Sequence, residues 1–173
     1  MYRKSVWTIK DNEMGNLDKH IKERILEFTS KGTFNKVVQS GRKIEGIDYV
    51  DLRREFFNIV EEYGEGADRV KIAEFELPLI IKYAKQRHPE LGDIIAISNF
   101  DLLFDTDYKI NYKEFIEYYS RDYKLILQSR SSIGGDMIYF YTYMSKENNQ
   151  YTIYSSAYLS TTDYSYQYIG PEE

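Results

Sequence analysis

The sequence predicts an α+β fold in which a helical N-terminal two-thirds packs on a C-terminal antiparallel β-meander of three or four strands. Two observations support this prediction. Apolar residues recur at helical spacing over residues 1–120, whereas the rest of the chain consists of short alternating runs broken by turn residues. Tyrosine is distributed just as unevenly, because 14 of the 18 tyrosines lie between Tyr108 and Tyr168. The 173 residues suit a single domain, 1–173.

The chain opens with a β-branched and aromatic run at 5–9, which favours a short strand, and a helix is expected to follow it. Asn16 is the candidate N-cap of this helix, and Gly32 ends it. The apolar residues that recur on one face of it are Leu17, Ile21, Ile25 and Phe28. The run 33–41 then alternates loosely, as a strand does.

A second helix is predicted over 49–63, with Asp48 as its N-cap. Gly64 follows it and can supply the left-handed residue at which many helices end. The core-facing residues of this helix are Leu52, Phe56, Ile59, Val60 and Tyr63.

The middle of the chain is less regular. Residues 67–77 fit a helix or a strand equally well. Pro78 suits the first turn of a further helix over 78–88, since proline lacks the N–H that a helix interior needs. A continuous apolar run at 92–98, which ends before Asn99, predicts a buried strand.

The stretch FDTDYKINYKEF, residues 104–115, has the alternating aspartates of a calcium loop but not its spacing. A twelve-residue calcium loop needs glycine at position 6 and glutamate at position 12. With Glu114 at position 12, Tyr108 takes the glycine position, and Leu103, which has no ligand oxygen, takes position 1. Asn111 instead fits the N-cap of a helix, with Glu114 three residues later.

From Tyr123 onward, alternating runs predict antiparallel strands. The pair Asn148-Asn149 is a candidate two-residue turn, because asparagine tolerates positive φ. The register that this turn implies pairs Met144 with Ile153, Phe140 with Ala157, Ile138 with Leu159, Tyr143 with Tyr154, Tyr139 with Tyr158 and Tyr141 with Ser156. A second turn near 161–162 is expected to return residues 164–168 to the same sheet.

This predicted sheet has an aliphatic face, which helices cover, and a second face rich in tyrosine. The tyrosines of the second face are Tyr139, Tyr141, Tyr143, Tyr154 and Tyr158. Tyrosine offers a large contact area and a polar tip with little rotamer entropy to lose, so this face is the candidate partner-binding surface. Two alternatives stay open: the tyrosines are strand formers on a wetted face, or helices cover them.

Composition and charge exclude several classes of function. The net charge of −5 provides no basic footprint for nucleic acid. The absence of cysteine excludes disulfides, thiolate nucleophiles and cysteine metal sites. No apolar run has the length of a signal peptide or a membrane span, so we expect a cytoplasmic protein without a membrane partner. The two histidines, His20 and His88, lack a second ligand at metal-binding spacing.

Carboxylates are the one catalytic resource that the chain has in quantity. Four of them crowd the segment after the predicted strand at 92–98, where they could hold magnesium in a hydrolase or nuclease. These four are Asp101, Asp105, Asp107 and Glu114. Acidic clusters in turns are usually solvated, so we expect no metal, no other cofactor and no catalytic residue. Gly134-Gly135 fits an anion-binding nest or an ordinary loop.

We therefore expect a non-enzymatic protein-binding protein. The profile of a small, acidic, cysteine-free and tyrosine-rich chain is similar to that of immunity proteins and of phage-encoded inhibitors, in a similarity that covers no motif. It implies an inhibitor that neutralises a toxin or a defence protein through the tyrosine face, with acidic residues steering a basic partner. The alternatives are the magnesium-dependent enzyme and a subunit of a larger assembly that adds a strand at the sheet edge 163–169. The sequence leaves the partner's identity and the oligomeric state open.

Overall fold

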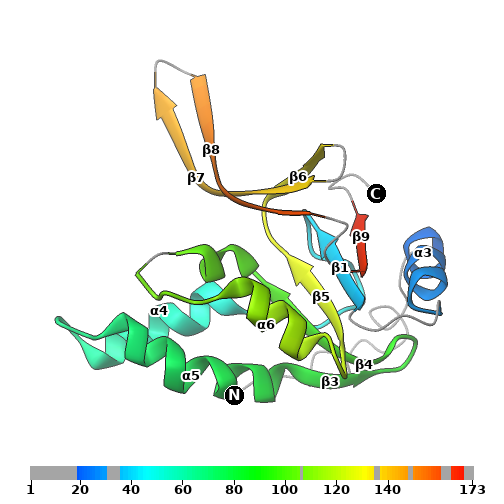
Figure 1. Ribbon diagram of the computed structural model, residues 1–173, viewed down its shortest axis with the longest axis horizontal. Helices are drawn as coiled ribbons and strands as arrows, with labels where there is room; N and C mark the ends of the chain where they lie inside the picture. Colours follow the sequence, from blue (N-terminus) through cyan, green and yellow to red (C-terminus); the bar gives the residue numbers. More distant parts are fainter. Residues whose placement is uncertain are drawn as a thin grey trace.

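The computed structural model describes residues 19–30, 36–105, 107–134, 137–147, 150–160 and 165–169, and side chains within these ranges up to residue 130. The described chain has an alternating α/β architecture, in which helices are interspersed between the strands of a mostly parallel sheet, sheet A (Figure 1). The predicted α+β arrangement, with helices first and an antiparallel meander last, is therefore wrong. The predicted strand at 5–9, Asn16, Leu17 and Gly32 lie outside the described residues.

Sheet A has the strand order β2-β4-β5-β1-β9, and these five strands run parallel. In chain order they are β1 (Lys36–Ser40), β2 (Val50–Asp51), β4 (Gly92–Ser98), β5 (Lys124–Gln128) and β9 (Ser165–Ile169). A further strand, β3 (Lys85–His88), pairs antiparallel with β4 on the edge that β2 also uses. Both faces of the sheet are covered, which explains why β4 is a continuous apolar run instead of an alternating one.

A hydrophobic core lies on each face of sheet A. On one face, α4 (Leu52–Tyr63), α5 (Arg69–Ala84) and α6 (Tyr112–Tyr119) cover Leu125 and Leu127. On the other face, α3 (Lys19–Ser30) covers Val38, Ala96 and Ile126. Burial of each large side chain contributes about 2 kcal/mol. The predicted core positions that are confirmed as buried are Ile21, Ile25, Leu52 and Phe56.

The start of α4 differs from the prediction by a few residues. The N-cap is Asp51, whose side chain accepts a hydrogen bond from the backbone N–H of Arg54 at 3.2 Å. Asp48 does not cap the helix, because residues 50–51 are extended and pair with β4 before the helix begins. The predicted end is confirmed, since Gly64 follows the helix with φ 78°.

The helix predicted after the aspartate-rich stretch is also confirmed. α6 begins at Tyr112, and the side chain of its N-cap, Asn111, accepts a hydrogen bond from the backbone N–H of Glu114 at 3.1 Å. Upstream, a short 3-10 helix, η1 (Phe100–Phe104), leads from β4 into the turn before α6.

One continuous helix replaces the helix predicted over 78–88. α5 includes most of the undecided residues 67–77, carries Pro78 in its interior and ends at Ala84. Residues 85–88 then pair with β4 as β3. Proline has no N–H to donate to the backbone carbonyl four residues earlier, which is that of Glu74. Glu74 and Pro78 are both exposed on the outer side of α5, where water can bind this carbonyl, so the interior proline is tolerable.

The C-terminal region contains a separate antiparallel sheet, sheet B, made of β6 (Ser131–Gly134), β7 (Met137–Glu147) and β8 (Gln150–Ser160). Five of the six predicted cross-strand pairs of β7 and β8 are confirmed: Met144–Ile153, Phe140–Ala157, Ile138–Leu159, Tyr143–Tyr154 and Tyr139–Tyr158. Tyr141 pairs with Ser155 instead of Ser156, because the pairing is irregular on both sides of Tyr141, as at a β-bulge. The predicted turn at 148–149 lies outside the described residues.

β9 does not return to sheet B. Its residues pair in parallel with β1, from Lys36 opposite Ser165 to Ser40 opposite Ile169. The predicted fourth strand of the meander is therefore an edge strand of sheet A, and residues 161–164 lie outside the described residues.

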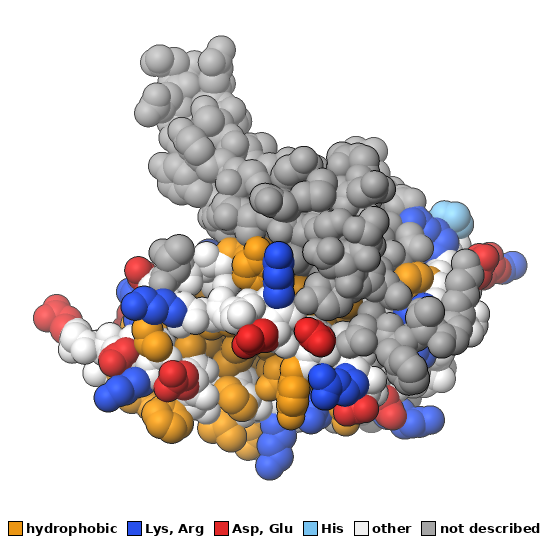
Figure 2. All heavy atoms as spheres, in the orientation of Figure 1, with side chains coloured by type: hydrophobic (Ala, Val, Ile, Leu, Met, Phe, Trp, Pro, Cys, Tyr) orange, Lys and Arg blue, Asp and Glu red, His pale blue; other side chains and the backbone are white. Residues whose placement is uncertain are grey.

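The helices on one face of sheet A are apolar outside as well as inside. Six large hydrophobic side chains in the described region are at least half exposed, and all lie on α4, α5 and α6: Phe57, Tyr63, Phe75, Leu79, Tyr83 and Tyr118. Figure 2 shows hydrophobic side chains gathered on the lower side of the view, where Figure 1 places α5. Among the described helices, none is long and apolar enough to cross a membrane.

Candidate functional site

The carboxyl ends of the parallel strands meet at one edge of sheet A, which is the edge where open α/β sheets bind ligands. Here the apolar runs of the strands give way to polar residues. We call seven of these residues the strand-end cluster: Ser40, Asp51, Arg53, Asn99, Asp101, Gln128 and Ser129.

Asn99 joins several strand ends. It follows β4 with left-handed backbone angles, φ 53° and ψ 42°, a conformation in which asparagine is enriched. Its side-chain amide donates to a carboxylate oxygen of Asp51 at 2.8 Å, and its backbone N–H donates to the side-chain oxygen of Gln128 at 3.2 Å. The Gln128 amide donates in turn to the carbonyl of Gly41, just after β1, at 3.3 Å. Side-chain hydrogen bonds therefore tie together the ends of β2, β4, β5 and β1.

Asp101 is the buried charge of the strand-end cluster. Its side chain is 2% exposed and forms an ion pair with Arg53, whose side chain is 49% exposed. Burial raises the pKa of the Asp101 carboxyl, and this effect outweighs the charges of Arg53 and Arg130, which lower it. The positive charges of Arg53 and Arg130 therefore stabilise the buried carboxylate of Asp101.

The loop after β1 has the glycine spacing of a phosphate loop without its chemistry. A phosphate loop has the pattern G-x-x-x-x-G-K-S/T and leads into a helix whose N-terminus faces the phosphates. Gly41 and Gly46 have this spacing, but Ile47 and Asp48 stand where the lysine and the hydroxyl residue belong. Residues 41–49 lead into β2 instead of a helix. The loop contains Arg42 and Lys43, but it lacks the lysine and the hydroxyl residue directly after the second glycine, and it does not run directly into a helix.

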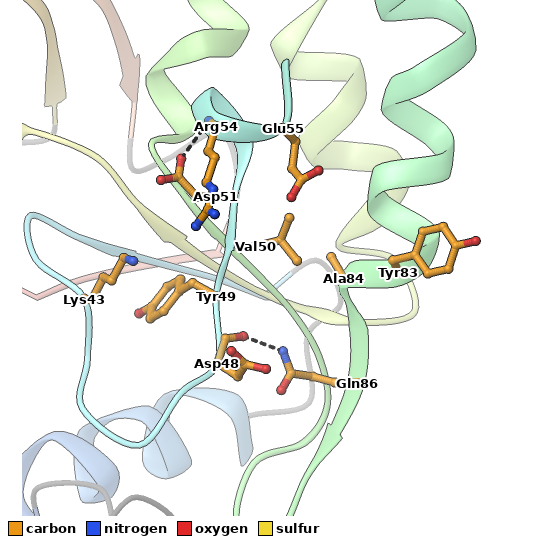
Figure 3. A pocket seen from close by; sticks show the side chains of 10 residues that line it. All are labelled: Lys43, Asp48, Tyr49, Val50, Asp51, Arg54, Glu55, Tyr83, Ala84 and Gln86. Carbon is orange, nitrogen blue, oxygen red and sulfur yellow. Dashed lines mark hydrogen bonds between the residues drawn. The ribbon is translucent and has the colours of Figure 1, made fainter. Parts of the chain in front are cut away.

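A pocket of about 190 Å³ opens on the β2 edge of sheet A, next to the strand-end cluster (Figure 3). Tyr49 forms part of its wall, and the Tyr49 hydroxyl accepts a hydrogen bond from the backbone N–H of Ile44 at 3.1 Å. Burial raises the pKa of Tyr49, so its hydroxyl stays protonated. On another wall, the side chain of Gln86 donates to the carbonyl of Asp48 at 2.7 Å.

The charges around this pocket are mixed. Figure 3 shows Arg54 and Glu55 extending from the start of α4 toward β2, with Lys43 on the opposite side. Its volume is smaller than the roughly 300–1,000 Å³ of typical small-molecule sites. Its lining includes no nucleophile beside a histidine base and no single-sign charge, so the pocket defines no substrate.

The four carboxylates of the predicted magnesium site are not brought together. Asp101 is buried against Arg53, whereas Asp107 forms an exposed ion pair with Arg69 at 3.0 Å. Asp105 accepts a hydrogen bond from the backbone N–H of Asp107 at 2.9 Å, as a turn residue. Glu114 lies in the first turn of α6. Within the described part of the chain, no three acidic or histidine side chains are grouped so that they could hold a metal ion.

The predicted partner-binding tyrosines lie on β7 and β8. The backbone pairing places Tyr139 opposite Tyr158 and Tyr143 opposite Tyr154, and Tyr141 lies between these pairs on β7. The prediction that their rings share one solvent-facing side concerns side chains beyond residue 130, outside those described.

Sequence reasoning singled out Asp101 but missed the other six residues of the strand-end cluster. A signal was present, since the three central strands end in polar residues at 39–40, 98–99 and 128–129. The prediction placed the chain from Tyr123 onward in an antiparallel meander and gave no pairing to the strands at 33–41 and 92–98, so it did not bring these ends together. Parallel pairing brings them to one edge.

The fold and the site together define a mostly parallel α/β protein with a hydrogen-bonded polar cluster at the carboxyl ends of its strands. Comparisons with known proteins add no relative: no protein-family model, no curated protein and no solved structure matches the chain.

Proposed function

We propose that the chain is a non-enzymatic protein-binding protein whose partner contacts the antiparallel pair of β7 and β8, which we call the arm (137–147 and 150–160). The partner is another protein, which the arm inhibits or neutralises. The net charge of −5 favours a basic partner, because opposite charges speed the encounter of two proteins. The lack of cysteine suits action in the reducing cytoplasm.

The observation that carries this proposal is the position of the arm. Figure 1 shows β7 and β8 extending together away from sheet A and its helices, while β7 lies against η1 at the base. β6 pairs only with residues 137–140 of β7, so the rest of the arm is a two-stranded ribbon in the described part of the chain, and such a ribbon is marginally stable on its own. Six tyrosines occur on these two strands, and tyrosine is a residue type that dominates binding energy at protein interfaces. A partner that covers the arm would stabilise it.

The strand-end edge supports the same proposal. Hydrogen bonds and the Asp101–Arg53 ion pair already engage the side chains of Asn99, Gln128 and Asp101. The loop 41–49 has the glycine spacing of a phosphate loop but not its lysine and hydroxyl residue, so this edge does not favour phosphate binding. No observation favours the magnesium-dependent hydrolase, whose four carboxylates are dispersed.

The experiment compares three tagged proteins as baits in extracts of the native cell: the wild type, the Tyr141→Ala/Tyr154→Ala variant, and Tyr118→Ala. Tyr118 is the matched control, because it is an exposed tyrosine on α6, away from the arm. We expect one protein that both the wild type and the control retain and the arm variant loses at least tenfold. Circular dichroism and the Tm of each bait verify the fold. Equal retention of every captured protein by all three folded baits would reject the proposal.

A further inference from the structure

Within the described residues, α5 presents an apolar surface to solvent. Phe75 is 68% exposed and Leu79 is 50% exposed, and Pro78 lies exposed beside them. We call Phe75, Pro78 and Leu79 the α5 row. Residues three and four apart share one side of a helix, so these three side chains form a continuous strip.

The opposite side of α5 is buried. Ala73, Leu77 and Ile81 are at most 7% exposed and pack into the core with α4 and sheet A. A helix that is apolar on both sides is typical of one that is covered on both sides. The α5 row therefore calls for a second covering surface.

The charges beside the α5 row indicate what that surface is. Glu74 and Lys82 are both exposed and lie four residues before and four residues after Pro78, in the same helical ridge. If a second α5 crosses the first in the antiparallel direction near Pro78, Glu74 of each copy faces Lys82 of the other. A parallel crossing would instead bring like charges together. The ridge is thus complementary to itself under a two-fold axis.

We propose that two copies of this chain associate through the α5 row, with their α5 helices antiparallel and with two Glu74–Lys82 pairs flanking the apolar strip. Packing of such i±4 ridges favours a crossing angle of about −50°. One helix face supplies less than the roughly 800 Å² per partner of a standard interface, so we expect a dimer that dissociates on dilution. The association is independent of the arm and goes beyond the proposed function.

Sedimentation velocity of the full chain, over a wide range of concentrations, tests the proposal. We expect the wild type to change from monomer to dimer as its concentration rises, and Leu79→Arg to remain a monomer. Phe57→Arg is the matched control, since Phe57 is 64% exposed on α4 and lies outside the α5 row. It should dimerise like the wild type.

Charge reversal tests the orientation. Glu74→Lys alone and Lys82→Glu alone should each raise the dimer dissociation constant about tenfold, because each creates two like-charge pairs in the dimer. The double variant should restore the wild-type value. A wild type that is monomeric at every concentration would overturn the proposal and leave the α5 row to a different protein. A dimer that is insensitive to Leu79→Arg, or a double variant that remains weakened, would overturn it as well.

Discussion

Asp101 and Arg53 form an unequal ion pair, because the carboxyl is buried and the guanidinium is half exposed. Arg53→Ala leaves the buried carboxylate with one cation fewer, so we expect it to lower the free energy of unfolding by about 2 kcal/mol at neutral pH. Asp101→Asn should preserve or raise that free energy, since the amide needs no ionisation and Arg53 can be solvated. Urea unfolding measures both changes.

Arg69→Ala is the matched control for Arg53→Ala, because the Arg69–Asp107 pair is exposed and should contribute less than about 1 kcal/mol. Equal losses in the two arginine variants would contradict the role assigned to Asp101. Burial raises the pKa of Asp101, so the folded state favours the protonated carboxyl. The stability advantage of Asp101→Asn over the wild type should therefore grow as the pH rises from about 4 to 7.

His88 is buried and acts as a structural connector. Its Nε2 atom lies 3.0 Å from the carbonyl oxygen of Gly46, and its Nδ1 atom accepts the backbone N–H groups of Glu90 and Leu91 at 3.0 and 3.1 Å. These contacts require a neutral ring with the proton on Nε2. Burial lowers the pKa of His88 below its ordinary value of 6.5, and this effect outweighs the contact with Gly46 and the charge of Glu90, which raise it.

The lowered pKa of His88 predicts a loss of stability in mild acid. The unfolded chain binds a proton near pH 6.5 and the folded chain only at lower pH, so stability should fall as the pH drops below about 6.5. His88→Asn should be less stable than the wild type at pH 7.5, yet its Tm should change less between about pH 7.5 and 5.5. His20→Asn, at an exposed site on α3, is the matched control for stability and should keep the wild-type Tm at pH 7.5. An unchanged dependence of Tm on pH in His88→Asn would refute this account.

The loop between β1 and β2, residues 41–49, determines whether this edge of sheet A can bind a phosphate. Gly41 and Gly46 keep a phosphate-loop spacing, but Asp48 would repel a phosphate, and β2 separates the loop from the N-terminus of α4, which Asp51 caps. We therefore expect that ATP with magnesium leaves the Tm unchanged, as does magnesium alone. A nucleotide-dependent rise in Tm, saturating at millimolar ATP, would contradict this expectation.

The sequence correctly predicted the helix ends that depend only on contacts within the helix itself. Asn111 and Gly64 lie where capping chemistry places them, because a cap contacts only its own helix. Asp48 and Pro78 misled for the opposite reason. Pairing with β4 holds residues 50–51 extended, and core packing keeps α5 continuous through the proline. At both positions the backbone structure depends on contacts between residues far apart in the sequence, and a local sequence pattern carries no information about such contacts.

The arrangement of the whole molecule depends on which strands pair, and that was the least predictable feature. A buried strand looks the same in sequence whether its neighbours are parallel or antiparallel, so the apolar run at 92–98 did not reveal sheet A. The tyrosine-rich runs were assigned to one meander, although β9 pairs with β1 across more than a hundred residues of sequence. The cross-strand pairs of the arm were predictable, because a short hairpin specifies its own register.

Parallel pairing has two consequences for function. It gathers the strand-end cluster at one edge of sheet A, where side-chain hydrogen bonds already hold its polar groups. It also leaves β7 and β8 to extend as an arm, because β9 returns to sheet A without them (Figure 1). The arm and the α5 row are therefore separate candidate surfaces on one chain.

The most direct test of the protein-binding proposal is photo-crosslinking in the native cell, with a photoreactive phenylalanine derivative at position 154 of the arm or at position 118 of α6. We predict that the probe at 154 crosslinks to one basic protein in near-equal stoichiometry and that the probe at 118 does not. If the folded protein gives no specific crosslink from 154, or the same crosslinks from both positions, the arm is not the binding surface and the proposed function is wrong.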